Sequence, residues 1–240
     1  MIIICFLFRS LAEYLAKGKE LEVVRPDTCL KPSCRRKDCF WKHTAYSRQV
    51  EDGNGEAVWI RIQRFKCRYC DLVVSCLFSF LVPYRRYSAG VIANSIGTYV
   101  TAPAKASLES YRKVAKDLGS TPMSVFRWTD LLGTRSKRLH RQIQKEFMLA
   151  GLPWQGLSAV PEHPVSPSSV RAKSEEKKAR LNGLLGLVEL SKVFIGSAAA
   201  ASVLEELHAY FLKNIESRQL MLTGRKIANR AQQSMGPQLF

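Results

Sequence analysis

The sequence predicts an α+β protein in which a small cysteine-bearing β-hairpin module precedes a helical domain and C-terminal helices. Three observations lead to this fold class. Six of the seven cysteines lie in residues 26–87, where the residue pattern is that of strands. Residues 88–150 have the apolar spacing of helices. Residues 151–180 hold four of the ten prolines together with serine, glycine and charge, a composition typical of linkers.

These changes in composition also predict the domain organisation. The first domain contains an N-terminal strand and helix together with the cysteine module. A helical domain, a linker, and C-terminal helices with a basic tail come after it. The boundaries of the four parts are 1–87, 88–150, 151–180 and 181–240.

The N-terminal run Ile2–Phe8 is apolar throughout, and Leu11–Lys17 has the pattern of a short helix. The run is too short to cross a bilayer, which takes about 20 residues in a helix. It also lacks the basic segment and the cleavage site of a signal peptide. We therefore expect a buried strand, a cytoplasmic protein and no membrane association. In that reducing compartment the cysteines are thiols or metal ligands rather than disulfides.

Two strands are expected on either side of a turn. The segments Trp41–Val50 and Ala57–Lys66 are strand-like, and residues 51–56 between them read EDGNGE, which suits a tight turn. In the second segment apolar side chains alternate with others, as in a half-buried strand. The inward set is Val58, Ile60 and Ile62, and the outward set is Trp59, Arg61 and Gln63. The pattern predicts a β-hairpin.

A pair of cysteines lies at each end of this hairpin. Cys29 and Cys34 precede its first strand, and Cys67 and Cys70 follow its second. Because a hairpin brings its two ends together, the four thiolates should converge at the roughly 2.3 Å bond length of a tetrahedral zinc site. The spacing therefore predicts a zinc ribbon with one structural Zn²⁺. The alternative is a set of reduced thiols in a small core; a thioredoxin-like redox pair lacks the βαβ context that it needs.

The remaining cysteines are less informative. Cys39 follows Cys34 by five residues and is an alternative ligand in place of Cys29 or Cys34, because the first turn is the looser of the two. Cys5 and Cys76 lie in apolar runs, where a free cysteine is usually a small buried hydrophobic residue.

Residues 111–128, YRKVAKDLGSTPMSVFRW, have the pattern of a helix-turn-helix. The first helix has an apolar inner face, and Gly119 suits the left-handed conformation at its end. The inner face consists of Val114, Ala115 and Leu118.

The second helix is expected over Pro122–Leu132. Thr121 is a good N-cap, and proline is tolerated best at the first helical position, which Pro122 occupies. Val125 and Trp128 then share one face. In a DNA-binding helix-turn-helix, the beginning of this helix enters the major groove.

The charge of the chain favours a polyanionic partner. Lys and Arg number 37 against 20 Asp and Glu, which gives a net charge of +17. The residues expected at base edges are Thr121, Met123, Ser124 and Arg127, with Arg127 suited to pair bidentately with guanine. Those expected at phosphates are Arg112, Lys113, Lys116, Arg135, Lys137 and Arg138. An ordinary helical bundle with a solvated basic surface is the alternative. A second basic cluster near the ribbon contains Arg64, Lys66, Arg68, Arg85 and Arg86.

Several stretches together resemble a known family. RPDTC and a second cysteine, then WKHTAYSR, RFKCRYC, YRRYS and the helix-turn-helix are similar to the N-terminal part of bacterial insertion-sequence transposases. There, a zinc ribbon and a helix-turn-helix recognise terminal inverted repeats. The N-terminus, with EYLAKGKELEVVRPDTC, resembles a stand-alone bacterial family built from the same two modules. The resemblance covers residues 1–150. It implies metal ligation by the four cysteines and DNA reading by Thr121–Trp128.

The catalytic half of such transposases is not predicted here. Their nuclease domain uses three spaced carboxylates to hold two metal ions, whereas Asp130 is the last aspartate of this chain. The later glutamates, such as Glu189, lie on predicted helices without a strand framework. We therefore expect a sequence-specific double-stranded DNA-binding protein without catalysis, either a transposon accessory protein or a transcriptional regulator. The alternatives are an active transposase or recombinase, and a protein–protein adaptor with a structural zinc ribbon.

Two helices are expected near the C-terminus, at 181–197 and 198–214, and each has a broad apolar face. These faces either pack onto the helical domain or form a homodimer. Charged residues within them argue against a membrane span.

Overall fold

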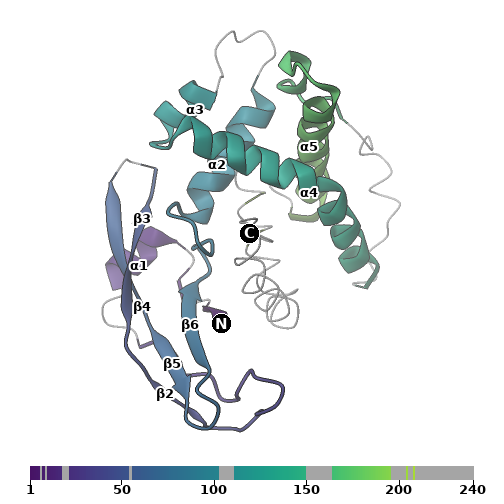
Figure 1. The fold of residues 1–240 in the computed structure, drawn as a ribbon. Coiled ribbons are helices and arrows are strands. Elements are labelled where there is room, and N and C mark those ends of the chain that lie inside the picture. The colour runs from purple at the N-terminus through teal and green to yellow at the C-terminus, as the bar shows by residue number, and fades with distance from the viewer. Residues whose placement is uncertain are drawn as a thin grey trace. The chain divides into compact units, whose positions relative to one another are not determined.

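A computed structural model describes residues 1–5, 7–8, 10–17, 22–53, 56–102, 111–149 and 164–195, together with 204 and 208 (Figure 1). The second predicted C-terminal helix and the basic tail lie almost entirely outside these residues. The chain folds into two compact units. Unit 1 comprises Met1–Asp52, Glu56–Ala89 and His208, and unit 2 comprises Gly53 and the described residues from Gly90 to Leu204.

Among the described residues, unit 1 contains two sheets and the helix Leu11–Lys17, and unit 2 is helical, so the predicted α+β class is confirmed. The larger sheet has the strand order β1-β6-β5-β2, with β1 parallel to β6 and the other pairs antiparallel. The smaller sheet pairs β3 with β4. In chain order the elements of unit 1 are β1 (Ile2–Cys5), α1 (Leu11–Lys17), β2 (Phe40–Lys42), β3 (Tyr46–Glu51), β4 (Ala57–Ile62), β5 (Arg64–Cys67) and β6 (Val73–Phe78).

The two predicted strands of the hairpin are each divided. Trp41–Val50 becomes β2 and β3, and Ala57–Lys66 becomes β4 and β5. Gln63 lies at the second break and is buried, although the alternation placed it outside. Its Nε2 donates hydrogen bonds to the carbonyl oxygens of His43 and Arg64, at 2.9 and 2.7 Å. This side chain therefore satisfies backbone groups at the point where the chain passes from one sheet to the other.

The N-terminal strand is shorter than predicted, and its residues are partly rather than fully buried. β1 ends at Cys5, but Phe8 beyond it is still buried. Its ring packs edge-on against Tyr14 of α1 and Phe78 of β6, with centroid separations of 5.4 and 5.1 Å. The helix predicted over Leu11–Lys17 is confirmed with the same bounds. This aromatic cluster anchors α1 to the core of unit 1.

Unit 2 is built around two long helices that pack together. Its elements are α2 (Ala89–Thr101), α3 (Tyr111–Asp117), α4 (Pro122–Leu149), a 3₁₀ turn (Ser169–Arg171) and α5 (Glu175–Ile195). The expected end of the second helix at Leu132 is wrong, because α4 continues to Leu149. A Cβ atom on Gly133 would lie 3.0 Å from the carbonyl oxygen of Arg180, so glycine is present because α5 passes close by.

Part of the expected linker belongs to unit 2. The hydroxyl groups of Ser166 and Ser168 donate hydrogen bonds to the carbonyl oxygens of Val100 and Tyr99 near the end of α2. The carbonyls at the end of a helix lack partners within it, and these serines supply some. Ser174 caps α5 by accepting a hydrogen bond from the N–H of Lys177 at 3.3 Å. The serines of this segment therefore provide hydrogen bonds at the end of α2 and at the beginning of α5.

Candidate metal centre and basic helix pair

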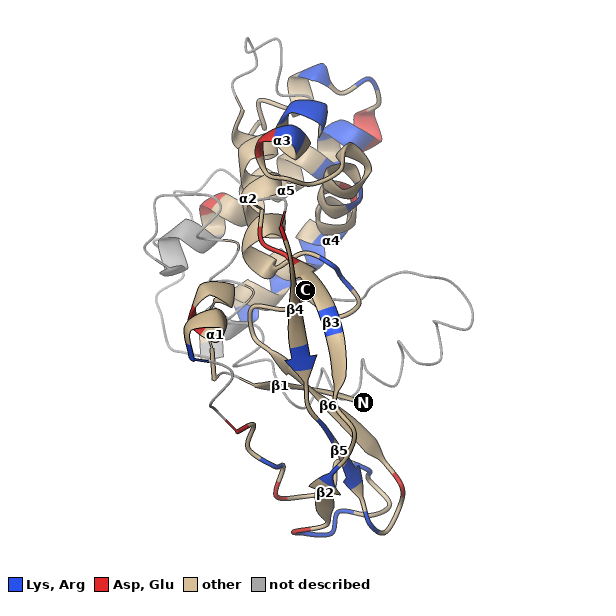
Figure 2. Cartoon of the chain, turned by 90° about the vertical axis from the view of Figure 1, so that its left-hand side faces the viewer, with Lys and Arg blue, Asp and Glu red and all other residues tan. Residues whose placement is uncertain are grey.

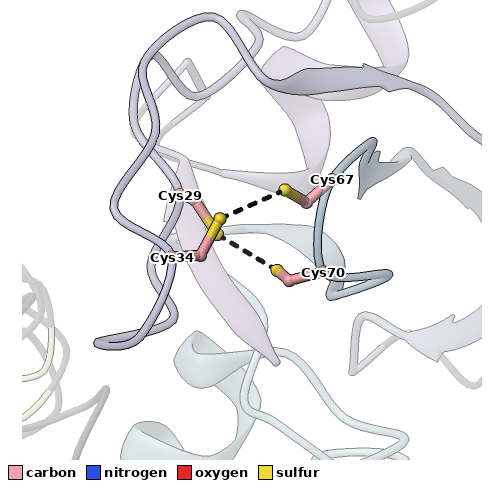
Figure 3. A group of neighbouring side chains, drawn as sticks. All are labelled: Cys29, Cys34, Cys67 and Cys70. Atoms are coloured by element: carbon pink, nitrogen blue, oxygen red, sulfur yellow. Dashed lines mark hydrogen bonds between the residues drawn. The ribbon is translucent and has the colours of Figure 1, made fainter.

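Four cysteines come together at one end of the larger sheet (Figure 3). The sulfur atoms of Cys29, Cys34, Cys67 and Cys70 all lie within 4.8 Å of one another. Cys29 and Cys70 are 3.5 Å apart, and Cys34 and Cys67 are 3.9 Å apart. In a tetrahedral site with bonds of 2.3 Å, ligand sulfurs are separated by about 3.8 Å. These four cysteines could therefore hold a metal ion, and the predicted convergence of the two pairs is confirmed.

Strand pairing brings the two cysteine turns together. Cys67 ends β5 and lies opposite Phe40 of β2, while Cys70 lies in the turn that leads into β6. The loop before β2 carries Cys29 and Cys34. It is tied to the sheet by a hydrogen bond of 2.9 Å from the N–H of Arg68 to the carbonyl of Cys39. Two segments separated by more than 30 residues thus face each other.

The two turns share a local geometry. In each, the residue after the second cysteine has a positive φ: Arg35 at 43° and Asp71 at 56°. These conformations cost energy in non-glycine residues and are kept only where the surroundings fix them. Figure 3 shows the two turns facing each other, with the four sulfur atoms between them.

Backbone N–H groups in these turns point at sulfur. Burial opposes a charge on Cys67, but the N–H groups of Tyr69 and Cys70 hydrogen-bond to its sulfur and lower its pKa to about 6. Burial raises the pKa of the Cys29 and Cys70 thiols, although the N–H groups of Lys31 and Leu72 bond to them. A cation among the sulfurs would favour all four thiolates, which is the form that binds metal.

Cys39 is close to the cluster but not a member of it. Its side chain is completely buried, and its sulfur contacts those of Cys29 and Cys67. The four sulfurs that share one centre are nevertheless those of the two predicted pairs. Cys5 and Cys76 lie elsewhere, and their side chains hydrogen-bond to each other across β1 and β6.

The helix pair α3–α4 has most of the interior that the sequence predicts; Leu118, expected on the inner face, is only partly buried. Val114 and Ala115 of α3 and Val125 and Trp128 of α4 are all buried. Gly119 in the connecting turn has a φ of 60°. Thr121 is the N-cap, since its Oγ1 accepts a hydrogen bond from the N–H of Ser124 at 3.1 Å.

The predicted DNA-contacting residues divide into two groups. Eight of them have exposed side chains: Arg112, Lys113, Lys116, Thr121, Met123, Arg127, Lys137 and Arg138. Ser124 and Arg135 are only partly exposed. The hydroxyl of Ser124 accepts a hydrogen bond from that of Thr121 at 2.9 Å, so it serves the cap. One guanidinium nitrogen of Arg135 is buried, which makes Arg135 a poorer candidate for a phosphate contact.

Sequence reasoning missed the ion pairs at the contact between the two long helices of unit 2. Asp130 of α4 forms an ion pair with Arg180 of α5, which also pairs with Glu176. Leu184, Leu187 and Val188 of α5 are fully buried. Packing of this apolar face onto the helical domain is one of the two alternatives expected from the sequence, whereas the length of α4 that it covers was not predicted.

The fold and the site define an α+β protein with a four-cysteine cluster able to hold a metal ion. Residues 31–122 match a family model described as a domain of unknown function (DUF6431), which covers well under half of the chain. The matched segment includes three of the four clustered cysteines and ends at the first residue of α4. No curated protein and no solved structure matches the chain. Among the described residues, no helix combines the length and apolar character needed to cross a membrane.

Proposed function

We propose that the chain is a sequence-specific, double-stranded DNA-binding protein in which a zinc ribbon accompanies a helix-turn-helix. The observation that carries the proposal is the helix pair α3–α4. Its inner side chains are buried, its turn contains a glycine with positive φ, and its outer surface carries exposed cations. Figure 2 shows Lys and Arg positions along α3. Neutralising phosphates on DNA requires such a surface.

The donor set of the cysteine cluster fits zinc. Four sulfurs without nitrogen or oxygen ligands suit a soft or borderline cation in tetrahedral geometry, and they exclude magnesium and calcium. Cys29, Cys34, Cys67 and Cys70 would hold the ion, which would cross-link the two turns and contribute to folding. Its role would be structural, because four protein ligands leave no open position for chemistry.

Different residues of the helix pair would contact the bases and the phosphates of DNA. Arg127 is exposed on the second turn of α4, where a recognition helix meets base edges. Arg112 and Lys116 on α3 are exposed and suit phosphate contacts. Met123 is exposed at the start of α4 and suits an apolar contact with thymine methyl groups.

Two rival functions are weaker. A transposase or recombinase needs spaced carboxylates, and the last aspartate, Asp130, is already paired with Arg180. The role of a protein–protein adaptor with a structural ribbon would not account for the exposed cations of α3. By resemblance to insertion-sequence transposases we place the protein in the bacterial cytoplasm, as a transposon accessory protein or a transcriptional regulator.

A homodimer through the C-terminal helices remains a prediction. Leu184, Leu187 and Val188 of α5 are already buried within unit 2, which favours packing onto α4 for this helix. Residues 198–214, the second candidate for the dimer contact, lie outside the described part of the chain apart from Leu204 and His208.

Selection from a pool of random duplex DNA tests the proposed function. The enriched duplex and a scrambled duplex are then bound by the wild type and by Arg127→Ala at fixed salt. We expect Arg127→Ala to weaken binding to the enriched duplex by about 1–3 kcal/mol and to reduce discrimination. Arg141→Ala is the matched control, since it changes the same residue type on the same helix about 21 Å further along. Failure to enrich any sequence, or equal losses on both duplexes for Arg127→Ala, would overturn the proposal.

A further inference from the structure

One face of the larger sheet combines an exposed aromatic ring with cations. Trp41 of β2 lies directly opposite Lys66 of β5, and the N–H of His43 bonds to the carbonyl of Arg64 at 2.9 Å. Residues paired in this way project from the same side of a sheet. Trp41, His43, Arg64 and Lys66 therefore share one side, which we call the Trp41 face. The other side of the same strands carries buried Phe40, Phe65 and Cys67.

The side chains of the Trp41 face are held in position. Arg64 donates hydrogen bonds to the carbonyl and the hydroxyl oxygens of Thr44, at 2.9 and 2.5 Å. Its guanidinium also lies 5.6 Å from the ring of Tyr46. The amino group of Lys66 is 2.8 Å from a carboxylate oxygen of Asp71. The Trp41 and His43 rings meet nearly edge to face at 5.6 Å. Positioned groups lose less entropy when they bind a ligand.

Exposed aromatic residues continue beyond this face. Trp41 is 40% exposed, and Tyr69, which follows β5, is 60% exposed with the Arg36 guanidinium 4.2 Å from its ring centroid. Figure 2 shows further Lys and Arg positions on β2, β5 and the loops beside them. An aromatic surface that only served packing would be covered by apolar side chains, whereas this one is bordered by cations.

Single-stranded nucleic acid has the chemistry that fits this face. Proteins bind it with aromatic rings on which bases stack and with cations that follow the phosphates. A duplex offers phosphates but hides the faces of its bases, so it would leave Trp41 unused. A protein partner would have to supply acidic groups to Arg64 and Lys66 and a pocket for the indole ring.

We propose that the Trp41 face binds single-stranded DNA, with Trp41 stacked on a base and with Arg64 and Lys66 at the neighbouring phosphates. The choice of DNA over RNA rests on the proposed function, whereas the binding surface itself does not involve α3 or α4. The inference thus adds a second DNA-binding site, which recognises a different form of DNA from that assigned to the helix pair.

Fluorescence anisotropy on the full, zinc-loaded chain tests this proposal. The probes are labelled oligo(dT), oligo(U) of equal length, and a duplex of random sequence. Trp41→Ala should weaken oligo(dT) binding about tenfold, and Trp41→Phe should restore most of the affinity, because phenylalanine also stacks. Trp59→Ala is the matched control: Trp59 is 64% exposed on β4 of the other sheet, and its replacement should leave the affinity unchanged. Zinc content and circular dichroism establish that each variant is folded.

Three results would overturn the proposal. They are no oligo(dT) binding by the wild type, equal losses in Trp41→Ala and Trp59→Ala, and binding of oligo(U) without oligo(dT). The variant Arg127→Ala distinguishes failure of this proposal from failure of the proposed function. Arg127 lies on α4, so its replacement should leave oligo(dT) binding unchanged. A variant that loses only discrimination between duplexes would have a defect in the helix pair. A variant that loses only oligo(dT) binding would have a defect in the Trp41 face.

Discussion

The sulfur atoms of Cys34 and Cys67 lie 3.9 Å apart, although the residues are separated by 33 positions in the chain. Each belongs to a turn that also holds a second cysteine, and both turns are fixed to the same end of one sheet.

Removing two ligands should abolish metal binding. The double variant Cys67→Ser/Cys70→Ser leaves only one pair of thiolates, and two ligands cannot hold a structural zinc ion tightly. Because such an ion contributes on the order of 10 kcal/mol of binding free energy to folding, unit 1 should lose its cooperative thermal transition. Metal content is measured by mass spectrometry after purification under reducing conditions without chelator.

Cys5→Ala is the control for this experiment, because Cys5 is a thiol outside the cluster. The wild type and Cys5→Ala should each contain one zinc per chain. Absence of zinc from the wild type, or retention of zinc in the double variant, would contradict the metal assignment.

Replacement of Cys39 by alanine should leave the metal in place. The sulfur of Cys39 contacts two members of the cluster but lies outside the group of four. Its loss removes a buried side chain, so we expect unfolding to become easier by about 1 kcal/mol, with one zinc still bound. The same metal analysis, together with chemical denaturation, checks this outcome. Loss of zinc from Cys39→Ala but not from Cys29→Ala or Cys34→Ala would make Cys39 a ligand in place of one of them.

Gly183 should not tolerate alanine. A Cβ atom there would lie 2.3 Å from Oγ of Ser136, which would have to rotate and give up its hydrogen bond of 2.8 Å to the carbonyl of Gly133. The Cβ of Ser136, at 3.2 Å, would also have to move away by a few tenths of an ångström. Alanine gains up to about 1 kcal/mol of helix propensity, but overpacking costs about 1–3 kcal/mol and should prevail. Urea denaturation of unit 2 measures the difference.

Gly186→Ala provides the matched control on the same helix. There, the nearest atoms to an added Cβ lie at 3.4 Å or more, which is ordinary contact. This variant should be slightly more stable than the wild type, by about 0.5–1 kcal/mol. If both alanine variants change stability in the same direction, the close crossing of the two helices does not explain Gly183.

Acid should weaken the fold partly through His208. Burial disfavours its protonated form and lowers its pKa to about 4, although a hydrogen bond of 3.2 Å to the Ser79 carbonyl acts in the opposite direction. In the unfolded chain the pKa is near 6.5. Between these values the unfolded state binds the proton and the folded state does not. Stability should therefore be fully present above pH 6.5 and fall as the pH drops toward 4, by at most about 1.4 kcal/mol per pH unit.

Denaturation of the wild type and His208→Asn at pH 7.5 and 5.5 measures this contribution. Loss of metal at low pH affects both proteins equally and cancels in the comparison. The variant should lose less stability than the wild type over this range. Identical losses would exclude His208 as a source of acid sensitivity.

The features that could be predicted from the sequence depend on short segments. The bounds of α1, the Thr121 cap and the meeting of the cysteine pairs each follow from neighbouring residues or from a single hairpin. The missed features depend on distant partners. Gly133 lowers helix propensity, yet α4 continues through it because α5, some 50 residues later, packs against it.

The candidate site shows the same division. The four cysteines could be identified from their spacing, because the two pairs flank segments that pair as strands and so bring the pairs together. The Trp41 face could not, since it depends on the register of β2 against β5, which follows a break at Gln63 that the uninterrupted alternation of the predicted strand does not reveal. Composition alone predicts a linker at Ser166 and Ser168. Their hydrogen bonds could not be predicted, because the carbonyl partners lie more than 60 residues earlier in the chain.

The parallel pairing of β1 with β6 has a consequence for biosynthesis. Ile2 is synthesised more than 70 residues before its partner Ser75. During synthesis the apolar strand β1 therefore remains unpaired until β6 has been made. Unpaired apolar strands are prone to aggregate or to bind chaperones. Cys70 is made just before β6, so the last of the four clustered cysteines emerges immediately before the strand that completes the sheet. Under the proposed zinc assignment, a shortage of zinc would expose nascent chains to misfolding at this step.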